Sequence, residues 1–161
     1  MKTMKKYLIY ILAFVSVILS SCDEKGDYEQ INSQVVDAAG EWWIKFSKTD
    51  YETGYLKVLT FNTAADVSNE MWIWDKGNWK NIKFKCPVDI STLTFNGSNL
   101  DDINSDVTIE VMNGKIEPGA GLSTAGNVTD KISFQITFSD EPGVVYNAVG
   151  TRKTGFVEDE H

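Results

Sequence analysis

Histidine and cysteine are almost absent from this 161-residue sequence, which contains one histidine and two cysteines. The histidine, His161, is the last residue, where we expect a frayed tail, so a Ser-His-Asp or Cys-His catalytic site would lack its base. A zinc site built from histidine and cysteine is excluded for the same reason. Cys22 belongs to an N-terminal motif described below, which leaves Cys86 without a partner and excludes a disulfide scaffold.

Long hydrophobic segments are also absent. The uncharged run at residues 7–19 is shorter than the roughly 20 apolar residues that a membrane-spanning helix needs, and its length is typical of a signal-peptide core. Three lysines precede this run, at positions 2, 5 and 6, and the motif Leu19-Ser20-Ser21-Cys22 ends it. The motif resembles the lipobox of bacterial lipoproteins. The alternatives are an ordinary cleaved signal with a chance cysteine and an uncleaved anchor.

The lipobox resemblance implies that residues 1–21 are a signal peptide and that the Cys22 thiol receives a diacylglyceryl group. Each buried methylene of an acyl chain such as palmitate contributes about 0.8 kcal/mol, so two or more chains give stable anchoring to a membrane. Residues 23–27 are acidic and resemble the surface-export signal of Bacteroidetes lipoproteins, with a solvated tether as the alternative. We therefore expect a lipid-anchored protein of the outer membrane, on its periplasmic or cell-surface face.

Charge of one sign dominates the sequence. It has 15 basic and 23 acidic residues and a formal net charge of −8, and loss of residues 1–21 would remove three lysines and no acid. Such a surface repels nucleic acid and anionic head groups, so neither is expected as a partner. The remaining chain is long enough for a single domain around one core.

From Gly40 onward, apolar residues recur at every second position, which is typical of half-buried strands. We predict eight strands, at residues 41–47, 55–62, 71–74, 79–86, 92–95, 107–112, 131–138 and 144–152. A tight hairpin turn is expected at residues 75–78 and a type I′ turn at Asn113-Gly114. Residues 114–129 contain four glycines and one proline and are expected to form a long loop or lid.

Most predicted strands have one apolar and one polar face, as expected for a closed antiparallel sheet around a single interior. Eight strands leave room for one small ligand, although a two-sheet sandwich would give the same alternation. The prediction is an all-β, eight-stranded, lipocalin-like (calycin-like) barrel at residues 39–157. It would follow the signal helix and a lipidated tether at residues 22–38, and precede a tail at residues 158–161.

Gly40-Glu41-Trp42 at the start of the first strand resembles the G-x-W pattern of lipocalins and related calycins. In that superfamily an arginine from the last strand packs on this tryptophan at the closed end of the barrel. The sequence has a single arginine, Arg152, in its last predicted strand. A desolvated cation–π contact between Trp42 and Arg152 would contribute about 1–2 kcal/mol. The pair is therefore expected to close the barrel.

Three segments are similar to a family of Bacteroidetes lipoproteins classed as lipid-binding putative hydrolases. They are the sequences at residues 40–43 (GEWW), 61–64 (FNTA) and 150–156 (GTRKTGF). With the lipobox, the resemblance extends over nearly the whole chain. It implies a calycin-like barrel and a lipid-type ligand.

The residues give little support to hydrolysis, and they favour a protein that is not an enzyme and needs no cofactor. Cys86 lies on an apolar strand face, where a buried, inert thiol is expected. Glu41 and Glu110 are the acids within predicted strands, but Glu41 should point outward, which leaves Glu110 without a mate. Residues 102–106 have the D-x-N-x-D spacing of a calcium loop, yet Val107 replaces its glycine, so an acidic surface turn is favoured and no metal site is predicted.

The sequence leaves two functions open. The first is a membrane-anchored carrier or sensor of a hydrophobic, lipid-like molecule. The second is a surface interaction module, such as an accessory subunit of an outer-membrane glycan-uptake system, in which outward-facing tryptophans would stack on sugar rings or contact a partner protein. In the first, the pocket would include Trp42, Trp72, Trp74, Phe84, Phe134 and Ile136.

Overall fold

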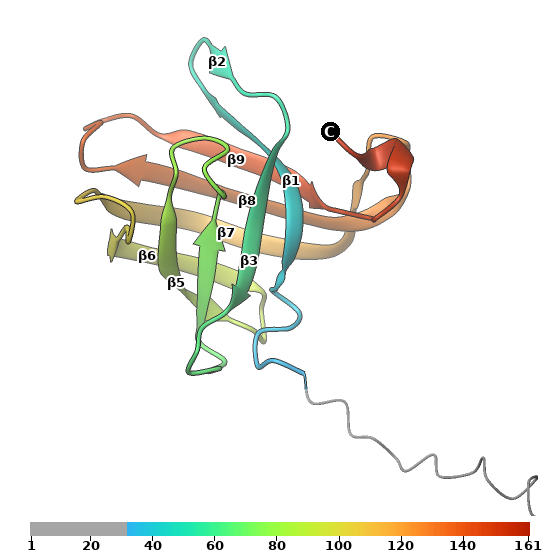
Figure 1. Cartoon of the computed structure of the whole chain (residues 1–161), viewed down its shortest axis with the longest axis horizontal. Coiled ribbons are helices and arrows are strands. Elements are labelled where there is room, and N and C mark those ends of the chain that lie inside the picture. The colour runs from blue at the N-terminus through green and yellow to red at the C-terminus, as the bar shows by residue number, and fades with distance from the viewer. Residues whose placement is uncertain (1–31) are drawn as a thin grey trace, which may run out of the picture. The chain divides into compact units, whose positions relative to one another are not determined.

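The computed structural model describes residues 32–161, so the expected signal peptide and Cys22 lie outside the described residues. Within that range the chain is all-β (Figure 1). Its strands are β1 (Gly40–Lys48), β2 (Tyr51–Glu52), β3 (Leu56–Asn62), β4 (Glu70–Trp74), β5 (Lys83–Asp89), β6 (Thr94–Asp101), β7 (Thr108–Leu122), β8 (Val128–Phe138) and β9 (Tyr146–Arg152). The described residues form one 3-10 turn, η1 (Val157–Asp159), and contain no helix of the length and hydropathy that crossing a bilayer requires.

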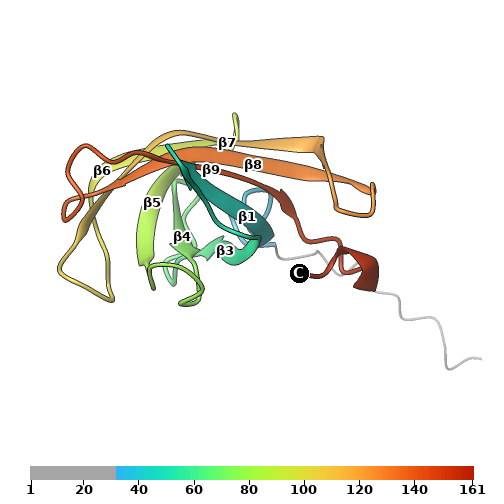
Figure 2. The same ribbon diagram turned by 90° about the horizontal axis from the view of Figure 1, so that it is seen from above.

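The sheet closes on itself. Antiparallel pairing runs in the order β2-β1-β3-β4-β5-β6-β7-β8-β9, and β1 also pairs with β9, with Trp42 opposite Arg152. Eight strands complete the ring, and β2 is a short extension that folds back on β1. Figure 2 shows β7, β8 and β9 crossing over β1, β3, β4 and β5. The predicted eight-stranded lipocalin-like barrel is therefore confirmed, and the two-sheet sandwich is wrong because the hydrogen-bonded ladder is continuous.

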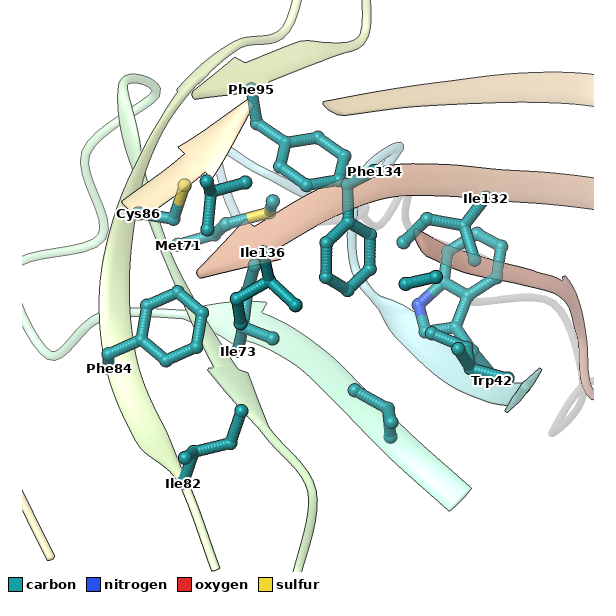
Figure 3. Close-up of a cluster of buried hydrophobic side chains, with 14 of the residues drawn as sticks. Trp42, Met71, Ile73, Ile82, Phe84, Cys86, Phe95, Ile132, Phe134 and Ile136 are labelled. Carbon is teal, nitrogen blue, oxygen red and sulfur yellow. The ribbon is translucent and has the colours of Figure 1, made fainter. Parts of the chain in front are cut away.

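Alternation along each strand builds the core. In β1, Trp42, Ile44 and Phe46 are buried and point inward, and in β8 alternate residues from Ile132 to Phe138 do the same. Burying a large apolar side chain contributes about 1.5–3 kcal/mol, so these inward rows account for most of the driving force for closure. Figure 3 shows inward side chains from both halves of the barrel meeting in one cluster.

The structure corrects the prediction of a loop at residues 114–129. Strand β7 continues to Leu122, and with β8 it forms a long hairpin whose last pairs are Gly121 with Thr129 and Leu122 with Val128. The expected type I′ turn is also wrong, because Asn113 (φ 53°) occupies a bulge in the ladder, where its left-handed conformation shifts the register between β7 and β8. Strand β6 likewise runs beyond the predicted end, to Asp101.

Both ends of the described chain pack more tightly than the sequence predicted. Residues 33–38, assigned to the tether, turn across one end of the barrel and bury Val35 and Ala38 completely. The final segment, expected to fray, is held by Asp159, which is 2% exposed and accepts hydrogen bonds from the Ala125 backbone (2.8 Å) and the Asn127 side chain (3.0 Å). Each end is therefore part of the folded domain.

Candidate ligand-binding site

One end of the barrel, here called the floor, is closed by Trp42 and Arg152. The Arg152 Cζ atom lies 4.5 Å from the centroid of the Trp42 ring. Trp42 is fully buried, and its Nε1 donates to Thr60 Oγ1 (2.8 Å), which in turn donates to the Ala38 carbonyl (2.6 Å). The indole therefore has a partner for its polar atom and a cation on its face.

Arg152 joins three segments at the floor. Its Nε donates to Asp130 Oδ2 (2.7 Å), and its two terminal nitrogens donate to the carbonyls of Asp37 (3.2 Å) and Ala39. Gly40 completes the arrangement, because a Cβ atom there would lie 3.1 Å from Arg152 Cζ and nearer still to Nη1. The glycine of the G-x-W motif is needed here to admit the guanidinium.

The interior residues predicted to line a pocket lie inside the barrel but pack on one another. Trp42, Phe84, Phe134 and Ile136 are each at most 4% exposed (Figure 3). Phe134 makes edge contacts with Phe46 (6.2 Å between centroids) and Phe95 (5.6 Å). The space expected for one small ligand is thus occupied by the side chains that were predicted to surround it.

Trp72 and Trp74 are placed on the outside of the barrel. They alternate with Met71 and Ile73, which are buried inside, so the two tryptophans cannot line the interior. Trp72 stacks with Phe61 (6.5 Å between centroids), and Lys83 Nζ lies 5.1 Å from the centroids of both Trp72 and Trp74. These rings form an outer platform, defined as Phe61, Trp72, Trp74 and Lys83.

The opposite end, here called the mouth, is covered by a loop at residues 75–82 where the sequence predicted a tight turn. Asp75 is fully buried, and its carboxylate accepts four backbone hydrogen bonds of 2.8–3.2 Å from within the loop. This bracing directs Trp79 over the barrel, where its ring stacks on Phe46 at 3.9 Å. Trp79 also makes edge contacts with Phe138 (5.7 Å) and Tyr146 (4.9 Å). Trp79 therefore acts as a plug.

Polar groups surround this plug. Lys80 Nζ pairs with Glu141 Oε1 (2.5 Å), Tyr146 donates to Glu141 Oε2 (2.7 Å), and Lys48 Nζ donates to the Tyr146 hydroxyl (2.9 Å). The hydrogen bond from Lys80, followed by that from Tyr146, lowers the pKa of Glu141. The bond to Tyr146 raises the pKa of Lys48. The four residues form a chain of contacts with two ammonium groups and one carboxylate, so this polar ring carries a net positive charge in an acidic protein.

A hollow of about 210 Å³ opens beside the plug. It is lined by Lys80, Ile82, Ser105, Val107, Phe138 and Asp140. Ile82 and Phe138 are nearly buried and belong to the interior core, so the hollow connects the polar ring with apolar side chains. This site was not predicted from the sequence, although Trp79 and Lys80, directly after the turn residues of the loop, could have indicated it.

Groups that could support hydrolysis are dispersed. Burial raises the pKa of the Cys86 thiol to about 12, so it is not a nucleophile at neutral pH. His161 lies outside the barrel, stacked on Tyr55 at 4.1 Å. Glu41 and Glu110 are both exposed on the outer surface. Asp102, from the calcium-like motif, instead accepts bonds from the Lys83 backbone (2.8 Å) and the Ser105 hydroxyl (2.7 Å), and residues 32–161 hold no cluster of three metal-ligating side chains.

A closed antiparallel barrel with a tryptophan–arginine floor defines the lipocalin-like fold class. The sequence matches the family model described as "Lipid-binding putative hydrolase" over residues 27–157, and the chain belongs to this family. No curated protein matches the sequence. Membership of a lipid-binding family and the barrel fold both fit the binding of a lipid or another small hydrophobic molecule.

Proposed function

We propose that this protein is a lipid-anchored lipoprotein that binds an elongated apolar molecule with an acidic head group through the barrel mouth. The observation that carries the proposal is the Lys80–Glu141 pair, which lies next to Trp79, with Lys80 lining a hollow that also contains Ile82 and Phe138. A ligand carboxylate or phosphate would take the place of Glu141 as the partner of Lys80. Its alkyl chain would contact Ile82 and Phe138.

Ligand entry requires the plug to move. The hollow of about 210 Å³ is smaller than the roughly 300–1,000 Å³ typical of small-molecule sites. Trp79 lies over the core on an exposed loop, so swinging its ring away from Phe46 would extend the hollow toward the interior. The side chain thus serves as a lid that the alkyl chain displaces, and the apolar surface of the ligand replaces its ring contacts.

A displacement titration with a fluorescent fatty acid tests this site on the purified protein. Trp79→Ala should strengthen probe binding, because it opens the mouth. Lys80→Met should weaken binding about tenfold, corresponding to about 1.4 kcal/mol, because the head group loses its cation. Matched controls on the outer platform, Trp74→Ala and Lys83→Met, should leave the affinity unchanged. Equal effects from both pairs of substitutions, or no saturable binding, would refute the proposal.

Anchoring forms the second part of the proposal. The lipobox resemblance at Leu19-Ser20-Ser21-Cys22 supports diacylglyceryl attachment to Cys22, and the acidic residues that follow support placement on the outer membrane. The measured mass of the purified protein should match a mature chain that begins at acylated Cys22. Cys22→Ser should abolish incorporation of labelled palmitate. A mature chain without acyl groups would contradict the anchor.

A second candidate is glycan recognition by the outer platform. The outward position of Trp72 and Trp74 favours it, since ring faces stack on sugars and Lys83 supplies a cation for an acidic sugar. Calorimetry with uronate-containing oligosaccharides, using Trp72→Ala and Trp74→Ala, tests this role. Trp79→Ala is the control, because the mouth takes no part in it. Unchanged heats with every glycan would exclude the candidate.

A further inference from the structure

The end of the β7–β8 hairpin and the C-terminal segment beside it carry exposed apolar side chains. Val157, Val128 and Leu122, at 87%, 73% and 65%, are the most exposed large apolar residues of the described chain; Ile103 (56%), at the mouth, and Phe156 (54%) follow. Leu122 and Val128 are paired partners at the end of the hairpin. We call Leu122, Val128, Phe156 and Val157 the apolar tip.

The two halves of the apolar tip belong to one projection. Asp159 accepts a hydrogen bond from the Ala125 backbone (2.8 Å) at the turn of the hairpin, and another from Asn127 (3.0 Å). This carboxylate also accepts a bond from Thr154 (2.7 Å), so residues 154–159 are fastened beside the turn. Figure 1 shows the tail, in red, next to the end of the hairpin. The segment that carries Phe156 and Val157 is therefore held beside the turn that joins Leu122 to Val128.

The projection extends from the floor end of the barrel. Strand β9 ends at Arg152, and its last pair with β8 joins Lys131 to Thr151. The pairing of β7 with β8 continues beyond that point to Leu122 and Val128 at the tip. The N-terminal segment crosses the same end, since Arg152 donates to the carbonyl of Asp37 (3.2 Å). Residues 33–39 and the apolar tip thus lie at the same end of the barrel.

We propose that the apolar tip inserts into the surface of the bilayer that holds the lipid on Cys22. This inference rests on the proposed anchoring. The nine residues between Cys22 and Asn32 give ten Cα–Cα steps, which can span at most about 36 Å, so the floor end stays close to the membrane. Four side chains are too few for a stable protein interface, which buries about 800 Å² on each partner, but they suffice to enter the acyl boundary.

The charged residues around the apolar tip indicate which lipid head groups it can approach. Glu158 is exposed beside Val157, and Glu160 pairs with Lys153 (2.8 Å), so no excess of cations surrounds the apolar residues. Anionic lipid would be repelled by the net charge of the protein. The tip therefore suits a surface of uncharged or zwitterionic lipids, such as phosphatidylcholine.

Site-specific fluorescence on the lipidated full chain tests the inference. A single cysteine is introduced by Val128→Cys or Val157→Cys and labelled with a polarity-sensitive dye, while buried Cys86 stays unlabelled. Ile103→Cys, in the β6–β7 loop at the mouth (56% exposed), and Val149→Cys, on the outer face of β9 (49%), are the controls. The proteins are placed in phosphatidylcholine vesicles that contain a lipid with a nitroxide high on its acyl chain.

Dyes at positions 128 and 157 should lose fluorescence to the nitroxide lipid and shift to the blue, whereas dyes at 103 and 149 should not. Equal quenching at all four positions, or none at 128 and 157 in protein that floats with the vesicles, overturns insertion and leaves anchoring intact. Protein that carries no acyl group and does not float overturns both proposals.

Discussion

Replacing Gly40 by alanine should destabilise the barrel through a collision with Arg152. The added Cβ would lie 3.1 Å from the Arg152 Cζ and within the space of Nη1. The backbone of Gly40 lies outside the left-handed region, so alanine meets no conformational penalty there. Any loss of stability therefore measures how tightly the guanidinium is held.

The magnitude follows from what Arg152 would give up. Overpacking of this kind costs about 1–3 kcal/mol. If the guanidinium moves instead, it loses contact with Asp130 (2.7 Å), the Asp37 carbonyl (3.2 Å) and the Trp42 ring (4.5 Å). Because the Arg152 side chain is 27% exposed, solvent weakens these contacts, and a loss of about 2 kcal/mol is expected.

Urea unfolding followed by tryptophan fluorescence measures this loss, and a double-mutant cycle identifies its cause. In an Arg152→Ala background the space beside Gly40 is vacant, so Gly40→Ala should cost less than about 0.5 kcal/mol there. Gly54→Ala is the matched control, because a Cβ at Gly54 would have no heavy atom within 4 Å. An equal cost of Gly40→Ala in both backgrounds would refute the reasoning.

Three further predictions concern buried polar groups. Thr60→Val should cost about 2–4 kcal/mol in urea unfolding, because it leaves Trp42 Nε1 and the Ala38 carbonyl without partners, whereas Thr60→Ser should cost far less; similar values for the two would contradict this. Native Cys86 should resist a disulfide reagent at pH 8 and react as the protein unfolds, since its thiol has a pKa of about 12; rapid labelling of folded protein would disprove burial. Burial alone would raise the pKa of Asp159, but hydrogen bonds from Asn127, Thr154 and the Ala125 backbone outweigh it and lower the pKa below 3.8. Docking of the tail should therefore be fully stabilised above pH 3.8 and weaken as the pH falls below it, with Asp159→Asn already weakened at pH 7; hydrogen exchange of residues 153–161 that is equally protected at pH 7 and pH 2.5 would exclude this.

The closed sheet was predictable because apolar and polar residues alternate clearly in the strands that build the core, such as β1 and β8. Trp42, Ile44 and Phe46 alternate with residues of the outer face, and the single arginine lies in the strand that pairs with β1. The continuation of β7 was not predictable in the same way. An Asn-Gly pair provides a left-handed residue equally well for a hairpin turn or for a bulge, and tertiary pairing of Gly114 with Phe95 decides between them.

The candidate site was harder to predict than the fold. Strand β4 is apolar on both faces, so periodicity shows that Trp72 and Trp74 share a face without showing which one. The Lys83 side chain lies over the rings of Trp72 and Trp74 and makes cation–π contacts with them. This cover lowers the free-energy cost of placing the two rings on the outer surface. The mouth depends on long-range contacts, such as Trp79 with Phe46 and Lys80 with Glu141, which local sequence patterns do not encode.

The two ends of the barrel differ in how easily they can open, and this decides the direction of ligand exchange. Opening the floor would break the Arg152–Asp130 pair and expose fully buried Trp42. Opening the mouth requires only that the Lys80–Glu141 pair and the ring contacts of Trp79 separate, while Asp75 keeps the loop itself folded. Exchange through the mouth is therefore favoured. If the floor faces the anchoring membrane, the mouth points away from it, because β1 runs from Trp42 at the floor to Phe46 beneath Trp79, about 13 Å further at about 3.3 Å per residue. A ligand would then pass between the barrel and a partner or solution on the far side, rather than directly into the bilayer that carries the anchor.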